Sequence, residues 1–331
     1  MIRVFTVVGD HLALSELGET DALPENAVWI DLLEPSRQED KRVEALTRVE
    51  IPTREDMKEI EESSRFYIEN GAHYMTTPLL HSVDTDHPGM QPITFILCGK
   101  RLITVRYCRP KSFLLFEKYA TKPSNGFITS NCDGFSILLG ILESVTDRAA
   151  DILEGISARL EEESHRLFGS SARIQHALTT PAFRKAMRHL GLEGSLLSKL
   201  LEALAGLTRL LVYVSVLNAS EKSKAKSSAR IKSLDRDAKS LTEHVDFLQN
   251  KITFLLDTII GLVSVEQNAI IKIFSVAAVG FMPPTLVASI YGMNFSHMPE
   301  LGWTLGYPWA VLLMILSAIL PLVFFRLKGW L

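Results

Sequence analysis

Small and polar residues recur at helical spacing through an apolar segment near the C-terminal end of the chain. The residues that follow one another at intervals of three or four are Asn268, Ile271, Ser275, Ala278, Met282, Thr285, Ser289 and Gly292. This spacing places them on one face of a helix. A helix surrounded by lipid gains nothing from such a stripe. The stripe therefore indicates a face that lines a pore or one that packs against another helix, because small residues also gather at helix contacts in membranes.

The segment that carries this stripe is one of two apolar runs long enough to cross a bilayer, which takes about 20 residues. The runs cover 273–291 and 303–325, and between Ile273 and Phe325 the only Asp, Glu, Lys or Arg is Glu300. Buried core helices of a soluble protein are the alternative, but two such runs in succession are unusual there. We predict spans at about 271–291 and 305–325. Pro283 and Pro284 need neighbours or water to satisfy the carbonyls that they free.

Basic residues predict the orientation of the two spans. Lys272 precedes the first run, Arg326 and Lys328 follow the second, and the loop between the runs has no Lys or Arg. The positive-inside rule then places both termini in the cytoplasm, at a plasma (inner) membrane, and the loop outside. Two spans in one chain cannot enclose a pore, so conduction would require a homo-oligomer.

The sequence before the two apolar runs predicts a cytoplasmic part, and we assign the chain to the α+β class. Residues 1–135 form the predicted α/β domain, 136–268 the long helices and 269–331 the membrane domain. The strand predictions are 2–8, 27–33, two strands within 65–80 about the turn Asn70-Gly71, 93–99 and 101–107. The helix predictions are 36–49, 51–63, 111–120, two long amphipathic runs, and 231–291 without a breaker, about 90 Å long.

Composition limits the possible functions. The chain of 331 residues has 35 basic and 38 acidic residues, which argues against a nucleic-acid partner. No catalytic motif is present, so we do not expect an enzyme. The acids Glu55, Asp56, Glu59, Glu61 and Glu62 form a patch that alone would be an exposed face. The segment with His73, His81, His87, Asp84 and Asp86 is a zinc site or, more simply, a solvated loop.

Two short motifs between the apolar runs resemble those of the CorA family of two-span divalent-cation channels. Tyr291-Gly292-Met293-Asn294-Phe295 matches the family's YGMNF, and Met298-Pro299-Glu300-Leu301 matches its MPEL. The resemblance implies a pentamer with a funnel-shaped cytoplasmic domain, in which the first span lines the pore and the second faces lipid. It places Asn268 at the cytoplasmic mouth, Ile271 and Phe274 at the gate, and Gly292, Met293 and Asn294 at the selectivity filter. It places Ala278, Met282 and Thr285 along the channel. The helical spacing of the stripe adds Ser289 to this pore-lining set.

The amide of Asn294 suits a hydrated ion. Mg²⁺ loses its water reluctantly, and a ring of neutral amide oxygens can accept hydrogen bonds from that water. A carboxylate ring would attract the ion more strongly but release it less readily, and conduction needs both steps. Glu300 of each subunit would gather cations outside.

The resemblance also implies that Mg²⁺ binds between cytoplasmic domains and keeps the channel closed. Glu55 and Asp56 lie where the family has an acidic pair. The expected partner Asp on the long helix falls on Ser233, with Asp235 and Asp237 nearby, and Asp257 matches another family Asp.

We therefore expect uptake of hydrated divalent cations, chiefly Mg²⁺ and also Co²⁺ or Ni²⁺, driven by the membrane potential. A Zn²⁺ transporter of the same fold is the alternative within this class. A membrane-tethered scaffold or signalling protein is the alternative from another class, although a scaffold does not need the polar stripe.

Overall fold

The computed structural model describes residues 1–18, 21–59, 61–85, 87–129, 131–168, 180–220, 225–294 and 298–328. It divides the chain into two compact units. The first comprises Met1–Ala177 and Arg184–Leu255, and the second comprises Leu178–Phe183 and Leu256–Leu331. The predicted class, an α+β part with long helices and C-terminal apolar helices, is confirmed. The division into three domains, with boundaries at 135 and 268, stays a prediction.

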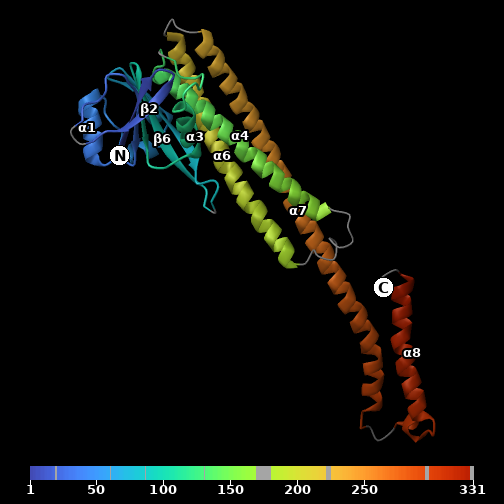
Figure 1. Cartoon of the computed structure of the whole chain (residues 1–331). Coiled ribbons are helices and arrows are strands. Elements are labelled where there is room, and N and C mark those ends of the chain that lie inside the picture. Colours follow the sequence, from blue (N-terminus) through green and yellow to red (C-terminus); the bar gives the residue numbers. More distant parts are fainter. Residues whose placement is uncertain are drawn as a thin grey trace. The chain divides into compact units, whose positions relative to one another are not determined.

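A seven-stranded sheet of order β2-β1-β3-β7-β6-β5-β4 forms the centre of the first unit (Figure 1). Its strands are β1 (Ile2–Val8), β2 (His11–Glu16), β3 (Ala27–Leu33), β4 (Phe66–Glu69), β5 (Ala72–His81), β6 (Gly89–Cys98) and β7 (Arg101–Arg106). Only the β3–β7 pair is parallel. The turn between β4 and β5 has positive φ at Asn70 (48°) and Gly71 (78°), as a tight hairpin requires. Strand β2 was not predicted.

One face of the sheet is covered by short elements. Helix α1 (Arg37–Thr47) starts with a capping box between Ser36 and Glu39, and its Val43 joins a buried cluster with Met57 and Tyr74. The helix predicted at 51–63 is wrong. The chain forms only the 3-10 turn η1 (Asp56–Lys58) and the four-residue helix α2 (Glu62–Arg65) there. The N-cap of η1 is Glu55, which makes no side-chain capping bond. The predicted cap Thr53 lies two residues earlier, and its Oγ1 accepts the Asp56 N–H.

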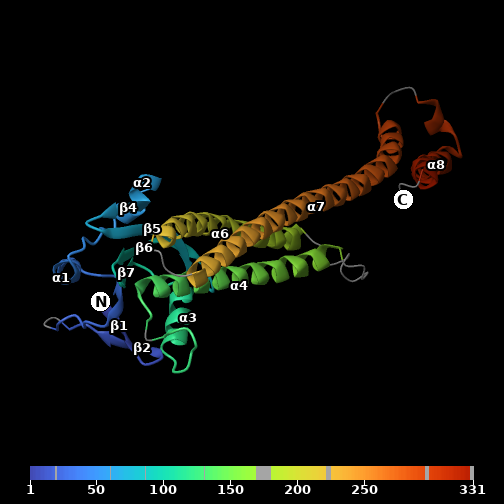
Figure 2. The ribbon, with the colours of Figure 1, turned by 90° about the horizontal axis from the view of Figure 1, so that it is seen from above.

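Helices cover the other face of the sheet (Figure 2). They are α3 (Lys111–Ala120), α4 (Gly134–Phe168) and α6 (Thr180–Ser220). The first part of α7 (Ala225–Tyr291) lies on the same side and packs against α4. Close approach fixes where α4 begins, because a Cβ atom on Gly134 would lie 2.3 Å from the backbone nitrogen of Leu102. The rings of Phe5 and Trp29 stack 4.1 Å apart on this face.

Ion pairs join the three long helices to one another within the first unit. Arg230 of α7 makes two 2.7 Å bonds to the carboxylate of Glu143 on α4. Arg159 of α4 bonds to Glu193 of α6 at 2.5 and 2.9 Å. The predicted unbroken helix is confirmed and is longer than expected, since α7 has 67 residues and runs through Pro283 and Pro284.

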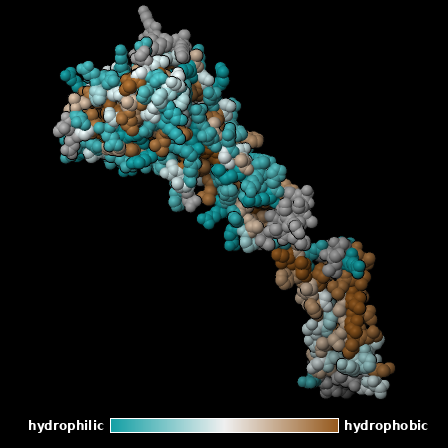
Figure 3. All heavy atoms as spheres, in the orientation of Figure 1, coloured by the Kyte–Doolittle hydropathy of each residue, from teal (hydrophilic) through white to brown (hydrophobic). Residues whose placement is uncertain are grey.

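The second unit contains the rest of α7, the 3-10 turn η2 (Pro299–Gly302) and α8 (Gly306–Leu327). Within the described part of the chain, three helices are long and apolar enough to cross a membrane: α6, α7 and α8. The most apolar window of α6 is 44% buried inside the protein, against 11% for α7 and 6% for α8. The apolar residues of α6 are therefore already used in packing within the first unit. Figure 3 shows strongly apolar side chains along α8, and a mixture of apolar and paler, less hydrophobic side chains along the end of α7.

Candidate ion-conduction site

Helix α7 packs against α8 through one face only. On that face Val276 is 6% exposed, and a Cβ atom on Gly280 would lie 3.6 Å from Cδ2 of Leu322. Pro283 and Val287 continue the same face at helical spacing and are half-buried. On α8 the most buried residue is Ala310. Small residues thus allow the two helices to approach closely.

The predicted pore-lining residues lie on the other side of α7. Ile271, Phe274 and Met282 are 62%, 71% and 68% exposed. Of the other members of the stripe, Asn268, Ala278, Thr285, Ser289 and Gly292 are also exposed, while Ser275, next to Val276, is half-buried. Ala278 lies two residues from both Val276 and Gly280, so it points away from α8. Packing against α8 therefore does not account for the stripe, and a pore or a contact with another chain remains.

The chain leaves α7 directly after Tyr291. The N–H of Gly292 still donates to the carbonyl of Ala288 (3.0 Å), and the N–H of Met293 donates to that of Ile290 (3.2 Å). Gly292 does not have a positive φ, so its role is not a left-handed helix cap. A Cβ atom there would instead lie 3.2 Å from the carbonyl oxygen of Ala288. Glycine therefore avoids crowding in the last turn before Asn294.

Asn294 follows this turn and is exposed. Its position at the end of the stripe leaves its amide free to face water or another chain. Phe295 lies outside the described residues. Glu300 lies in η2, and its side chain is also outside the described part of the structure.

The backbone of α7 is unusual at the level of Gly280. Pro283 and Pro284 have no N–H and cannot bond to the carbonyls one turn earlier, those of Val279 and Gly280. The hydroxyl of Thr285 donates to the carbonyl of Phe281 (2.8 Å). The helix continues because the neighbouring bonds remain, but part of its polar backbone is left without its usual helical partner.

The acidic residues predicted to form a regulatory site are not brought together within one chain. Glu55 and Asp56 lie beside η1, on the α1 face of the sheet. Asp235 and Asp237 lie on α7, on the side of the opposite face. Asp257 lies on the part of α7 that belongs to the second unit and is exposed. Among the described residues no group of three His, Cys, Asp or Glu side chains is placed to hold a metal.

Three of these acids, Asp56, Asp235 and Asp237, already have partners inside the chain. The carboxylate of Asp56 accepts the N–H and the hydroxyl of Thr53 (2.9 and 2.8 Å). Asp235 pairs with Lys239 at 2.7 Å, and the Ser233 hydroxyl lies 3.5 Å from the carboxylate of Asp237. A metal at either place would compete with these bonds.

Sequence reasoning missed an acidic row on α4. Glu143, Asp147 and Asp151 are spaced by four residues, which is the signal that could have revealed them. The pKa of the Asp147 carboxyl is raised by burial and then by the charges of Glu143, Asp151 and Asp237. Asp237 therefore faces the α4 row rather than Asp56.

The histidines of the β5–β6 region do not gather into a zinc site. His73 Nδ1 lies 3.2 Å from the hydroxyl of Tyr213, while Asp84 bonds to Lys111 and Arg148. Asp86 lies outside the described residues. Among the described residues of this segment, no three His, Cys, Asp or Glu side chains are placed together to hold a metal.

Comparison with known proteins decides the family. The sequence model of the family described as CorA-like Mg²⁺ transporter protein matches residues 24–327. The chain belongs to this CorA family. The magnesium transport protein CorA of Escherichia coli K12 is 33% identical over 333 residues, and the match covers all of both chains. That of Yersinia pseudotuberculosis is 34% identical over 332 residues, again over both full lengths.

Solved structures agree with the CorA fold. The complete structure of the CorA magnesium transporter from Methanocaldococcus jannaschii matches with a TM-score of 0.77 at 18% identity. The match covers 100% of this chain and 99% of that one. The resemblance drawn from YGMNF and MPEL is thus confirmed, and Mg²⁺ transport is the function of the CorA family.

Proposed function

We propose that this CorA-family chain forms a channel for the uptake of hydrated divalent cations, chiefly Mg²⁺ and also Co²⁺ or Ni²⁺. The observation that carries the proposal is the exposed stripe of α7, which lies opposite α8 and ends at Asn294. A lipid-facing helix does not need this stripe, and packing against α8 leaves it uncovered. The driving force is an inside-negative potential, worth about 2.3 kcal/mol per charge per 100 mV.

The conduction path is made by several copies of the chain. One α7 cannot enclose a pore, so the stripes of neighbouring chains must face one another across an axis. We take the number of copies as five from the family resemblance. In this arrangement α8 lies outside α7 against lipid, which fits its exposed apolar residues Leu316, Leu320 and Phe324. Residues 271–291 and 305–325 form the two spans, with both termini in the cytoplasm of a cell with an inner membrane.

Each residue of the stripe has a proposed role along the path. The amides of Asn294 form the outer ring with Gly292 and Met293, and they accept hydrogen bonds from water on the ion. Ala278, Met282, Thr285 and Ser289 line the channel. Ile271 and Phe274 narrow it at the gate, and Asn268 lies at the cytoplasmic mouth. Glu300 raises the cation concentration outside.

Intracellular Mg²⁺ closes the channel in this proposal. Glu55 and Asp56 of one chain and Asp235 or Asp237 of the next form the regulatory site, with Asp257 as a further acid on α7. A site shared between chains fits the finding that these acids lie on opposite faces of one sheet. Empty carboxylates repel one another, and Mg²⁺ between them holds the chains together.

Transport of different ions tests the proposal. Full-length protein in liposomes is loaded with an ion-sensitive dye, and influx of Mg²⁺, Co²⁺, Ni²⁺ and Zn²⁺ is compared under the same inside-negative potential. We expect Mg²⁺ influx that collapses when the potential is removed. Zn²⁺ as the preferred ion would support the alternative transporter of the same fold, for which the family and the two curated relatives give no support. No influx of any ion would overturn the proposal and favour a scaffold.

A further inference from the structure

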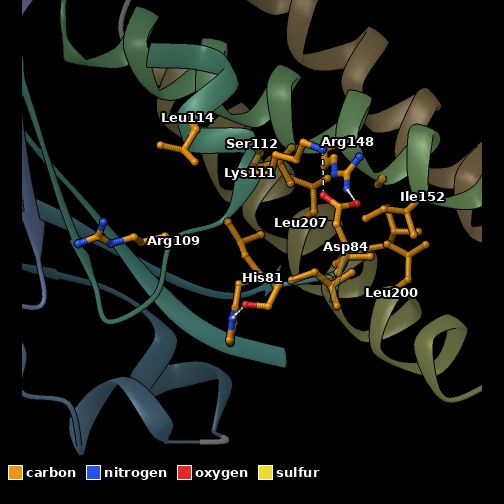
Figure 4. A pocket seen from close by; sticks show the side chains of 18 of the residues that line it. His81, Asp84, Arg109, Lys111, Ser112, Leu114, Arg148, Ile152, Leu200 and Leu207 are labelled. Atoms are coloured by element: carbon orange, nitrogen blue, oxygen red, sulfur yellow. Dashed lines mark hydrogen bonds and ion pairs between the residues drawn. The ribbon is translucent and has the colours of Figure 1, made fainter. Parts of the chain in front are cut away.

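A cavity of about 340 Å³ lies within the first unit, far along the sequence from the stripe of α7. The end of β5 and the residues after it, the start of α3, and the helices α4 and α6 surround it (Figure 4). This volume falls within the range of about 300–1,000 Å³ that is usual for small-molecule sites.

The interior of the cavity is apolar. Five of the side chains that form it, from β5, α4 and α6, are each at most 6% exposed. They are Leu79, Ile152, Leu200, Leu204 and Leu207. A ligand that fills this space must therefore have an apolar body, because a polar one would lose its hydrogen bonds to water without replacement.

The mouth of the cavity carries a cluster of cations around one carboxylate. Arg148 Nη2 lies 2.6 Å from Oδ1 of Asp84, and Lys111 Nζ lies 2.9 Å from Oδ2. Figure 4 shows the three side chains meeting at one edge of the cavity. Arg109 also lines the cavity. Among the described residues, Asp151 is a second acid of this region, and its carboxylate lies 3.7 Å from Arg148. His81 adds no positive charge at neutral pH, since burial and Lys199 lower its pKa.

The partners in this cluster differ in burial. The side chain of Arg148 is 16% exposed, whereas that of Asp84 is 60% exposed. Asp84 therefore approaches the cations from the solvent side, and exposed ion pairs are weak. The first turn of α3 adds a further attraction for anions, because its N-cap, Pro110, supplies no side-chain bond to the free N–H groups.

We propose that the cavity binds a small carboxylate with an apolar body, whose carboxylate replaces that of Asp84 between Lys111 and Arg148. The group that already occupies the two cations has this chemistry. The apolar body then fills the space formed by α4, α6 and β5. Displacing Asp84 into water costs little because most of its side chain is already exposed.

Binding of 2-naphthoate to the full-length protein in nanodiscs tests this site. Isothermal titration calorimetry measures its affinity, with empty nanodiscs as the blank and the neutral isostere 2-naphthylmethanol as the matched ligand. We expect one saturable site per chain for the carboxylate and about tenfold weaker binding of the alcohol, the loss of one charged contact.

Variants separate the parts of the proposal. Asp84→Asn removes the competing charge and should strengthen naphthoate binding, whereas Lys111→Gln and Arg148→Gln should weaken it. Ala203→Phe adds a ring to the wall of the cavity and should abolish binding without changing a charge. Lys118→Gln, on an exposed position of the same helix α3, is the control and should leave affinity unchanged. Thermal unfolding of each variant confirms that it is folded.

Two results would overturn the proposal. The first is that both the wild type and Asp84→Asn release no more heat with naphthoate than empty nanodiscs do. Asp84 would then only link the β5–β6 segment to helices α3 and α4. The other is naphthoate binding that survives in folded Ala203→Phe, which would place the ligand elsewhere.

Discussion

At the residue scale, our proposal makes Asn294 a filter for hydrated cations that carries no charge. Its side chain is exposed after a tight helix end, and Gly292 keeps that end free of a Cβ atom beside the carbonyl of Ala288. A neutral amide binds the ion's water more weakly than a carboxylate does. The residue type therefore favours fast release over tight binding.

Replacing this amide should change transport without changing assembly. Asn294→Ala is expected to abolish selective Mg²⁺ influx, because the ring loses its acceptors. Asn294→Asp should bind Mg²⁺ more tightly and pass it more slowly. Influx into liposomes measures both effects, and Ser317→Ala on α8 is the control. Normal influx and ion preference in Asn294→Ala would contradict the role of the ring.

The reactivity of single cysteines tests how deeply residues of the first unit are buried. Cys108 is 5% exposed, and burial raises the pKa of its thiol to about 11. Because the thiolate is the reactive form, Cys108 should resist iodoacetamide at pH 8, while the half-buried Cys98 is labelled first. Mass spectrometry of the folded protein measures the order, and unfolded protein should label at all three cysteines. Equal rates for Cys98 and Cys108 in the folded protein would be inconsistent with this burial.

At the scale of elements, the last turns of helix α7 have one face that packs against α8 and one that is exposed. Val276 and Gly280 face α8, while Ala278 and Met282 lie on the exposed stripe. One face of α7 thus packs against α8, and the other face, of nearly the same apolar composition, lines the conduction path in our proposal.

A matched pair of substitutions separates these faces. Gly280→Phe should destabilise the α7–α8 pair, because the ring has no room beside Leu322, at a typical cost of about 1–3 kcal/mol. Ala278→Phe adds the same ring to the exposed face and should preserve stability while it reduces influx. Thermal unfolding in detergent and liposome influx measure the two effects. A destabilising Ala278→Phe with a harmless Gly280→Phe would reverse our assignment of the faces.

At the scale of the whole molecule, α7 contributes to both units without a break, while the proposed regulatory acids lie apart in one chain. The proposed pore and the proposed Mg²⁺ site would therefore both need other copies of the chain.

Oligomerisation is the first prediction at this scale. Because one α7 cannot enclose a path, protein purified in mild detergent should have the mass of about five chains. The number five comes from the family resemblance, and other closed symmetries are the general alternatives. Light scattering corrected for detergent measures it. A stable monomer with full transport activity would refute the prediction.

Protection by Mg²⁺ is the second prediction at this scale. If Mg²⁺ favours the closed state, it must bind that state more tightly, so saturating Mg²⁺ should slow proteolysis of the first unit. Asp56→Asn keeps an acceptor for Thr53 but removes the charge. It should weaken protection and raise influx at high internal Mg²⁺. Equal proteolysis of the wild type with chelator and with saturating Mg²⁺ would show that the acidic patch is only a solvated face.

The sequence by itself determined the class of the protein and the long helices. Apolar length, the positions of Lys272 and Arg326, and the motifs around Asn294 are local or periodic signals, and they were enough to predict the α+β part, the continuous helix to Tyr291 and the family. Strand β1 and the turn at Asn70-Gly71 could also be predicted. A strand favours certain residue types, and a turn with positive φ favours Asn and Gly.

The tertiary structure decided what depends on neighbours distant in sequence. Only a 3-10 turn follows Thr53 because the following residues pack against β6 and the α1 cluster. Asp237 faces the acids of α4, and the apolar length of α6 serves packing in the first unit. The cavity beside Asp84 joins residues from β5, α3, α4 and α6. Such juxtapositions follow from how sheet and helices pack, and no local pattern in the sequence records them.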